Sequence, residues 1–442
     1  MKKLLLLSVL FVSLTAATIN LTNPENYAAQ SIPSYIVKDN MPPNNELTNL
    51  GATLGRVLFY DKNLSSNNTI ACASCHKQQF AFGDTARLSV GLNGGLTGRH
   101  TMRLVNSRFG IEPKFFWDER AESLEQQTTQ PIQDHVEMGF SGTEGQPDLD
   151  SLIRKLESIP YYHVLFTMAF GTPQITEDRM QKALAQFIRS IQSFDSRFDA
   201  GLAATGNLGA PFPNFTPQEN NGKAIFLAPP PAGAGCQGCH QAPEFDIDPN
   251  SLNNGVLATA ANPLILDLTN TRAPSLRDLV NPNGTPNGPM MHNGNFQNLQ
   301  AIINHYNLIP LTPGNNNLDP RLAGPGGNLQ LTPGEQAALI QFLRTLTGVN
   351  IYTDQKWSNP FDQDGNLDLV YCSFTPNITG STEVCGNNTS FYSVPVGPAG
   401  TIYYWTVTGG TILNSPPYTN TIEIQWNVPA TNASVSITQF EP

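Results

Sequence analysis

Two short cysteine motifs in this chain have the spacing that attaches haem to a protein. The motifs consist of Cys72, Cys75 and His76, and of Cys236, Cys239 and His240. Two thiols set three positions apart can add to the two vinyl groups of one haem, and the adjacent histidine is then placed to ligate the iron. The sequence therefore predicts two covalently bound haem c groups, with His76 and His240 as their proximal ligands.

Each motif has an alternative interpretation that its context disfavours. Paired cysteines can form half of a zinc site, but zinc pairs lie tens of residues apart, whereas these two pairs are about 160 residues apart. A thioredoxin-like dithiol would need a βαβ setting, which the sequence does not predict. Because two such motifs follow similar lead-in segments, haem is favoured over either alternative.

The lead-in segments indicate that the two haem units are related. Leu54–Phe59 and Gly222–Phe226 each combine a short helical pattern with a glycine and a terminal phenylalanine. Twelve residues separate the first segment from its motif, and nine separate the second. This weak internal duplication predicts two cytochrome-like domains.

Helical patterns continue between and after the motifs. Thr176 is an expected N-cap, and apolar residues follow at helical spacing, at Met180, Leu184, Phe187, Ile191 and Phe194. A second helix should begin with a capping box between Thr332 and Glu335 and stop at Gly348. The haem units are therefore expected to be mainly α-helical.

The pattern changes near residue 352, where Asn, Thr, Ser and β-branched residues become dominant. Residues 401–408 and 421–428 alternate as strands do, and in the second strand the apolar positions share one face. The predicted fold is thus multidomain, with two mainly α-helical cytochrome c-like haem domains followed by a small all-β sandwich. The expected segments are a signal peptide (1–17), an N-terminal arm (18–47), a first haem domain (48–205), a second haem domain (206–350), a linker (351–372) and the sandwich (373–442).

The net charge and the N-terminal segment limit the partners and the location expected for this chain. The 442-residue chain carries a net charge of −11, which argues against nucleic acid and would suit a positively charged electron donor. Met1–Lys3, the apolar run 4–14 and the small residues near Ala17 predict an export signal, and no later segment is apolar enough to span a membrane. We expect a periplasmic, extracellular or cell-surface protein.

The two cysteines outside the haem motifs, Cys372 and Cys385, could form a disulfide or remain free thiols.

Several separated segments resemble the bacterial di-haem cytochrome c peroxidase and MauG family in their family order. They cover roughly residues 48–350 and comprise Leu54–His76, Phe116–Gln127, Pro131–Ile132, Glu137–Gly139, Ala273–Asp278 and Met291–Gly294. Two further segments, 404–410 and 424–427, resemble PKD-like, immunoglobulin-type modules. The resemblance implies a peroxidatic first haem, an electron-transferring second haem and a C-terminal module for spacing or attachment.

The resemblance also assigns roles around the first haem. Glu137 and Gln127, with Pro131 between them, match the family's distal pocket, and Trp117 matches the tryptophan between the two haems. A carboxylate over an open iron can move a proton between the oxygens of hydrogen peroxide if burial raises its pKa. Gln127 can hydrogen-bond the bound peroxide. Without that context, Glu137 would be an ordinary solvated carboxylate and Trp117 a core aromatic residue.

Two departures from the family pattern bear on the subtype. Leu92 stands where a histidine of the family caps the first iron in the resting state, so we expect that haem to be five-coordinate and open to peroxide. His100 is the one nearby residue that could act as a cap instead. It also replaces an asparagine that helps the family to bind calcium, and this replacement leaves a calcium ion between the haems in doubt.

The sixth ligand of the second haem is expected to be Tyr306. The family's peroxidases use a methionine in this region, whereas MauG-like members use a tyrosine. Leu299, Ile302, Ile303 and Tyr306 share one helical face, which directs Tyr306 inward and His305 aside. A phenolate oxygen would stabilise ferric iron and lower the haem potential. His305, Met290 or Met291 remains an alternative ligand.

The sequence therefore predicts a secreted di-haem peroxidase, MauG-like in its ligands, that reduces hydrogen peroxide at the His76 haem. Electrons would pass through Trp117 from the His240 haem, and the external donor would be a small cytochrome c, a copper protein or a protein substrate. A reductively activated cytochrome c peroxidase and a non-catalytic di-haem electron carrier are the alternatives. The sequence leaves the oligomeric state open, with a homodimer as one option.

Overall fold

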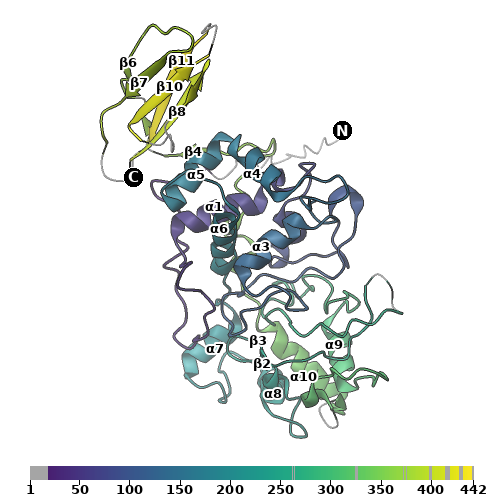
Figure 1. The fold of residues 1–442 in the computed structure, drawn as a ribbon. Helices are drawn as coiled ribbons and strands as arrows, with labels where there is room; N and C mark the ends of the chain where they lie inside the picture. The colour runs from purple at the N-terminus through teal and green to yellow at the C-terminus, as the bar shows by residue number, and fades with distance from the viewer. Residues whose placement is uncertain are drawn as a thin grey trace, which may run out of the picture.

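The computed structural model describes residues 18–442 except 261, 263, 324–326, 372, 375, 398–400, 414–418, 428–431 and 441–442. The expected signal peptide at 1–17 lies outside the described residues. The described chain forms two helical regions and a β-sheet module, which projects from one end of the molecule (Figure 1). This arrangement confirms the expected fold class. None of the described helices is long and apolar enough to cross a membrane.

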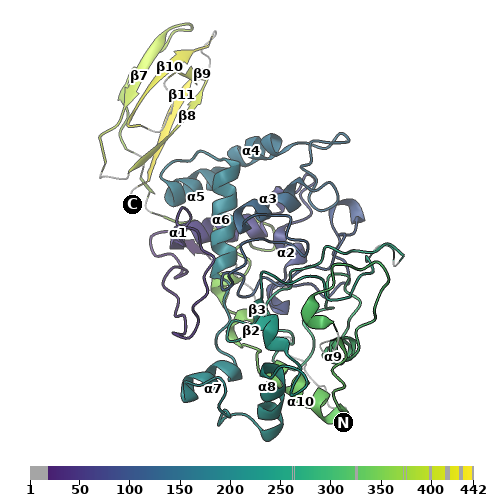
Figure 2. The same ribbon diagram turned by 60° about the horizontal axis from the view of Figure 1, so that its bottom comes forward.

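The helices fall into two groups that follow the chain. The first group contains α1 (Asn49–Tyr60), α2 (Cys72–Cys75), α3 (Leu124–Gln133), α4 (Leu149–Glu157), α5 (Pro160–Phe170) and α6 (Glu177–Ser190). The second group contains α7 (Arg197–Thr205), α8 (Pro217–Leu227), α9 (Leu299–Asn307) and α10 (Pro333–Arg344). In the turned view of Figure 2, the second group lies at the end of the molecule away from the β-sheet module.

The two groups repeat one packing motif, as the lead-in segments predict. In the first, Gly55 of α1 lies so close to α6 that an added Cβ would sit 1.9 Å from the Ala183 carbonyl oxygen. In the second, Gly222 of α8 approaches α10, and an added Cβ would sit 2.0 Å from the Ala338 carbonyl oxygen. Only glycine allows two helix backbones to approach this closely. The internal duplication is therefore confirmed as a repeated helix pair.

Aromatic side chains extend the repeat toward the cysteine motifs. The rings of Phe59 and Phe187 are 5.1 Å apart, and those of Phe226 and Phe342 are 5.3 Å apart. A phenylalanine with positive φ follows each Cys-x-x-Cys-His motif, and its ring packs on the phenylalanine of the lead-in helix. Each haem unit thus has the same aromatic core beside its motif.

Short strands and the N-terminal arm connect the parts. β1 (Ile19–Asn20) pairs in parallel with β4 (Leu369–Val370), and β2 (His240–Gln241) pairs with β3 (Asp246–Ile247). Farther along the arm, the Tyr35 hydroxyl donates to the Asp199 carboxylate at 2.9 Å. The arm therefore joins the start of the chain to the segment before the β-sheet module and then reaches the second group of helices.

The C-terminal module is a sandwich of two antiparallel sheets. One sheet has the order β6 (Thr379–Gly380), β7 (Thr389–Ser393), β10 (Thr421–Trp426) and β9 (Gly410–Ile412). The other has the order β5 (Ser373–Phe374), β11 (Ser434–Phe440) and β8 (Ile402–Thr408). As predicted, Ile422, Ile424 and Trp426 are buried between the sheets. Tyr404 of β8 stacks on His163 of α5 with ring centres 4.9 Å apart, so the module contacts the first helical group.

The structure tests the predicted helix caps, whereas the predicted disulfide lies partly outside the described residues. The capping box of Thr332 and Glu335 is confirmed at the start of α10, and Thr176 caps α6, which ends at Ser190, before Ile191 and Phe194. The candidate disulfide involves Cys372, which lies outside the described residues, and Cys385 is an exposed free thiol.

Candidate active site

A cavity of about 430 Å³ in the first helical region gathers most of the residues predicted for peroxide chemistry. The predicted residues on its wall are Cys75, His76, Trp117, Gln127, Pro131 and Glu137. They come from α2, α3 and the loops that flank them. The structure thus brings together side chains that are up to 62 positions apart in the sequence.

α2 presents the first Cys-x-x-Cys-His motif to this cavity. The helix is a single turn, Cys72–Cys75, and His76 is its C-cap. The Nδ1 atom of His76 donates a hydrogen bond to the Phe82 carbonyl oxygen at 3.1 Å. This bond fixes the tautomer and leaves Nε2 without a proton, as an iron ligand requires. Burial lowers the pKa of His76, which favours the neutral, ligating form.

α3 and the turn after it position the distal residues. Ser123 caps α3, which carries Gln127 and has Pro131 in its last turn. Beyond the helix, the Asp134 carboxylate accepts hydrogen bonds from the backbone amides of Val136 and Glu137 at 2.8 and 2.9 Å. This turn holds Glu137 at the cavity wall.

The Glu137 carboxyl group has the electrostatic setting of an acid/base catalyst. Burial, and to a smaller extent the nearby Asp134 carboxylate, raise its pKa to about 7, although Arg120 partly offsets both effects. A carboxyl group with a pKa near neutrality can both accept and donate a proton at physiological pH.

The loop that contains Leu92 packs beside this turn. The Leu92 amide donates to the carbonyl oxygens of Val136 and Glu137 at 2.7 and 3.1 Å. The buried Leu92 side chain lies against Gly139, where an added Cβ would meet Leu92 Cδ2 at 2.5 Å. Leu92 is not among the described residues that line the first cavity. Its side chain therefore serves packing.

A second cavity, of about 170 Å³, lies in the second helical region and contains the other motif. Cys236, Cys239, His240 and Tyr306 line it together with a largely apolar wall that includes Phe226, Ile247, Leu276, Leu299, Ile303 and Leu343. The Nδ1 atom of His240 is buried and has no hydrogen-bond partner among the described residues. Burial lowers the pKa of His240 to about 4, so the imidazole is neutral.

The residues near Tyr306 bear on the choice of the sixth ligand. Tyr306 projects from α9 into the cavity, and its hydroxyl oxygen accepts a hydrogen bond from Asn254 Nδ2 at 3.0 Å. His305 Nε2 instead donates to the Asn254 carbonyl oxygen at 2.9 Å, which occupies the nitrogen that an iron would need. Met290 and Met291 also line the cavity. This geometry favours Tyr306 over His305 and leaves the methionines as alternatives.

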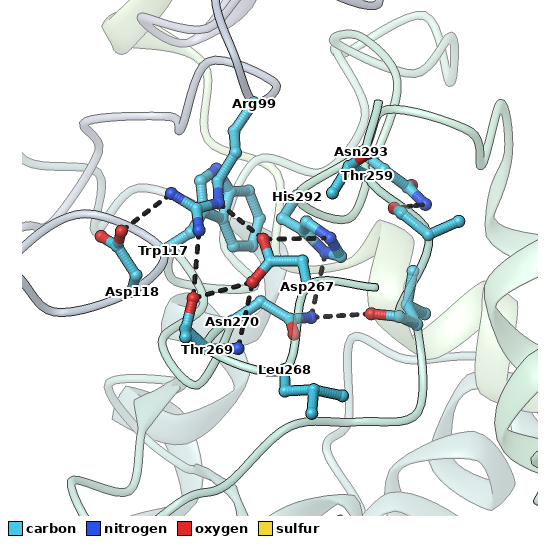
Figure 3. A network of polar contacts seen from close by, with 12 residues as sticks. Arg99, Trp117, Asp118, Thr259, Asp267, Leu268, Thr269, Asn270, His292 and Asn293 are labelled. Carbon is cyan, nitrogen blue, oxygen red and sulfur yellow. Dashed lines mark hydrogen bonds and ion pairs between the residues drawn. The ribbon is translucent and has the colours of Figure 1, made fainter. Parts of the chain in front are cut away.

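Trp117 lies in the wall that the two cavities share. It is 8% exposed, its Nε1 donates to the His100 carbonyl oxygen at 2.7 Å, and its ring centre is 6.3 Å from that of His292 (Figure 3). His100 lines both cavities as well, and its Nδ1 donates to the Arg87 carbonyl oxygen at 3.1 Å. An indole in this position is well placed to pass electrons between groups bound in the two cavities.

A polar network surrounds Trp117 on one side. The Arg99 guanidinium contacts the carboxylates of Asp118 and Asp267, each at 2.8 Å (Figure 3). His292 Nδ1 accepts from Asn270 Nδ2 at 2.9 Å, and its Nε2 faces Asp267 at 3.6 Å. Because Arg99 neutralises both carboxylates, they are poor candidates for a calcium site. Among the described residues, no group of three His, Cys, Asp or Glu side chains is arranged to hold a metal ion.

The cysteine and histidine side chains of both cavities, and several buried nitrogen atoms that lack hydrogen-bond partners, fit haem c. The second cavity is lined by Cys236, Cys239 and His240, and the first by Cys75 and His76, with Cys72 one helical turn before Cys75. Thiols held in this way can form thioethers with haem vinyl groups. His240 Nδ1 and nitrogen atoms of Arg103 and Arg272 are buried without partners. The sequence prediction missed both arginines. Arg272 directly precedes the Ala273–Asp278 segment, but Arg103 carries no motif signal.

Comparisons with known proteins give a consistent result. A model of the di-haem cytochrome c peroxidase family matches residues 49–207, and a PKD-like domain model matches residues 373–440. Methylamine utilization protein MauG of Methylophilus methylotrophus is 31% identical over 351 residues, which cover 78% of this chain and 94% of that protein. Cytochrome c551 peroxidase of Nitrosomonas europaea is 26% identical over 353 residues, covering 76% of this chain and 92% of that protein.

Solved structures share the fold of the helical regions. A MauG-like protein associated with microbial copper homeostasis superposes with a TM-score of 0.61 at 26% identity, over 75% of this chain and 98% of its own. The di-haem peroxidase BthA of Burkholderia thailandensis superposes with a TM-score of 0.52 at 21% identity, over 77% of this chain and 93% of its own. The second match is a likeness of fold only.

Proposed function

The chain belongs to the di-haem cytochrome c peroxidase and MauG family of peroxide-using oxidoreductases, and on that basis we propose which residues bind peroxide, which transfer protons and which carry electrons. Hydrogen peroxide binds in the first cavity, beside His76. Electrons reach it through Trp117 from the second cavity, where His240 and Tyr306 would hold the iron of a bound haem. One observation carries this proposal: Trp117 lines both cavities, and the first of them also contains Gln127, Pro131 and Glu137.

The residues of the first cavity supply proton chemistry. When haem is bound, its iron supplies electrons for cleavage of the O–O bond. Glu137 accepts the proton from the nearer peroxide oxygen and returns it to the departing oxygen, which leaves as water. Gln127 donates a hydrogen bond to the peroxide and stabilises the negative charge that develops during cleavage. Pro131 lacks an amide proton and fills the cavity wall between them.

The residues of the second cavity and of the shared wall supply the electron route. Tyr306 would hold the iron of a bound haem through its phenol oxygen, and such an anionic oxygen ligand would favour the ferric state. The indole of Trp117 is fixed by its hydrogen bond to the His100 carbonyl oxygen, so it keeps one orientation between the cavities. The absence of Leu92 from the lining of the first cavity is consistent with a first haem that is open without prior reduction.

The remaining parts of the proposal concern location and partners. The Lys-Lys start, apolar run and small residues of 1–17 support export to the periplasm or cell surface. The negative net charge favours a positively charged electron donor, such as a small cytochrome c, a copper protein or a basic surface of a protein substrate.

Stopped-flow spectroscopy of the ferric protein with stoichiometric hydrogen peroxide tests this proposal. We expect haem analysis to find two haem groups per chain, and one of the two to react with peroxide within the first phase. The second haem should then be oxidised in a slower phase. A protein whose two haems can be reduced and oxidised but do not react with peroxide would be an electron carrier, and the proposal would be wrong.

A further inference from the structure

Two arginines stand in the wall between the cavities without a role in the peroxide chemistry. Arg103 and Arg272 each line both the first and the second cavity. Arg103 belongs to the segment 101–105 that follows His100, and Arg272 belongs to the segment 270–276. The side chain of each arginine therefore borders the space of both cavities.

The Arg103 guanidinium lacks an anionic partner. Its Nη2 donates to the Ser275 carbonyl oxygen at 3.2 Å, and its Nε is buried without a hydrogen-bond partner. No carboxylate of the described residues lies within ion-pair distance of Arg103. Burial lowers the pKa of Arg103 to about 10, an effect that Asp278 and Tyr352 only partly offset. The group still carries its charge at neutral pH, and no carboxylate of the described residues forms an ion pair with it.

Arg272 is paired only loosely. It is 5% exposed, and its Nη2 lies 3.8 Å from the Asp246 carboxylate, too far for a hydrogen bond. Its Nη1 is buried without a partner, and the guanidinium carbon lies 4.8 Å above the centre of the Phe115 ring. The remaining N–H groups of Arg272 are therefore free to bind an anion.

A buried guanidinium with unpaired N–H groups is costly unless an anion completes it. Arginine is well suited to binding carboxylates because its planar N–H groups match the two oxygens. Each haem c carries two propionate carboxylates, and these groups must be neutralised where the macrocycle is buried. The anions that these arginines would bind are therefore propionate groups of the haems bound in the two cavities.

We propose that Arg103 and Arg272 form a shared cationic site that binds propionate carboxylates of both haems and so couples their potentials to one pair of charges. The inference rests on the proposed binding of a haem in each cavity. A positive charge beside a propionate favours the reduced, less positive iron, so each arginine holds both haem potentials above the values they would otherwise have. A purely structural arginine would affect folding and leave the potentials unchanged.

The test is spectroelectrochemical titration of both haems in the holoprotein carrying Arg103→Gln. We expect the reduction equilibrium constant of each haem to fall about tenfold, which is about 59 mV for a one-electron couple. Arg103→Lys keeps the charge and should recover most of both potentials. Arg154→Gln removes an exposed arginine of α4 and should change neither potential.

Three outcomes would overturn the inference. Unchanged potentials in Arg103→Gln, an equal loss in Arg103→Lys, or a shift confined to one haem would each contradict a shared propionate site. If Arg103→Gln fails to fold, Arg272→Gln provides the same test, with a downward shift of both haem potentials as the expected result. Haem content and the reaction with peroxide are measured on the same samples. A parent protein that lacks two haems or does not react with peroxide would contradict the proposed function, whereas a reactive protein with unshifted variants contradicts this site alone.

Discussion

Replacing Glu137 by glutamine should remove the proton transfer on which peroxide cleavage depends. The change keeps the size of the side chain and its position in the turn, because the hydrogen bonds of this turn involve the backbone amide and the Asp134 carboxylate. General acid/base catalysis contributes about 10² to 10⁴ in rate, so we expect the second-order rate constant with peroxide to fall by that factor.

The pH dependence of the same rate constant provides a second measure. Only ionised Glu137 can accept the peroxide proton, and burial together with Asp134 raises its pKa to about 7. The ionised fraction then rises from roughly 1/11 at pH 6 to roughly 10/11 at pH 8, so the wild-type rate constant should rise about tenfold. In Glu137→Gln this dependence should disappear.

Asp134→Asn provides the matched control. Asparagine can still accept the two backbone hydrogen bonds through its amide oxygen, but it removes the negative charge that raises the pKa of Glu137. The midpoint of the pH profile should therefore move to lower pH while the rate constant at high pH stays the same. The rate constants are measured by stopped flow from pH 5 to 9. This reasoning would be refuted if Glu137→Gln reacted with peroxide within threefold of the wild-type rate constant, or if Glu137→Gln kept the pH profile of the wild type.

Three further predictions concern the electron route and the packing. Trp117→Phe should leave the first reaction with peroxide intact and slow the later oxidation of the second haem; equal rates for both phases would show that electrons take another route. Asp199→Asn breaks the buried pair with Arg277 (2.9 Å) and should lower the free energy of unfolding by about 3 to 5 kcal/mol, measured in denaturant. Burial opposes ionisation of Asp199, but the Arg277 guanidinium lowers the pKa of this carboxyl group overall. The stabilisation by the ion pair is therefore present above about pH 4 and is lost as the pH falls through the folded-state pKa of Asp199. If Asp199→Asn lost no less stability in acid than at neutral pH, this explanation would be contradicted. Gly222→Ala should push α8 from α10 and lower the melting temperature clearly more than Gly209→Ala, a change at an open loop position.

Local chemistry could be predicted from the sequence because it depends on residues close together in the chain. The Cys-x-x-Cys-His motifs, the cap at Thr176 and the capping box at Thr332 each use contacts within a few positions. The inward direction of Tyr306 also followed, since helical periodicity alone separates it from His305. The glycine and phenylalanine of each lead-in segment marked the first helix of each repeated pair, although the second helix lies far along the chain, as in the approach of Gly55 to Ala183.

The wall between the cavities could not be predicted, because it forms where loops far apart in the sequence meet. Arg103 and Arg272 are 169 positions apart, and neither is part of a pattern that points to the other. The packing of Leu92 against Gly139 likewise depends on the turn that Asp134 closes, which hydrophobic periodicity does not reveal. α6 ends before Ile191 although the apolar pattern continues, because the Ser193 amide donates to Asn106 at 2.8 Å and the chain departs from helical geometry.

Low-temperature EPR of the purified ferric protein, before and after stoichiometric peroxide, tests the central claim most directly. That claim is that the two haem sites differ and that the one beside His76 is open to peroxide. The account predicts one high-spin and one low-spin signal, with the high-spin signal lost when peroxide is added. Two low-spin signals that do not respond to peroxide would contradict it and would indicate that His100 or another side chain caps the first iron.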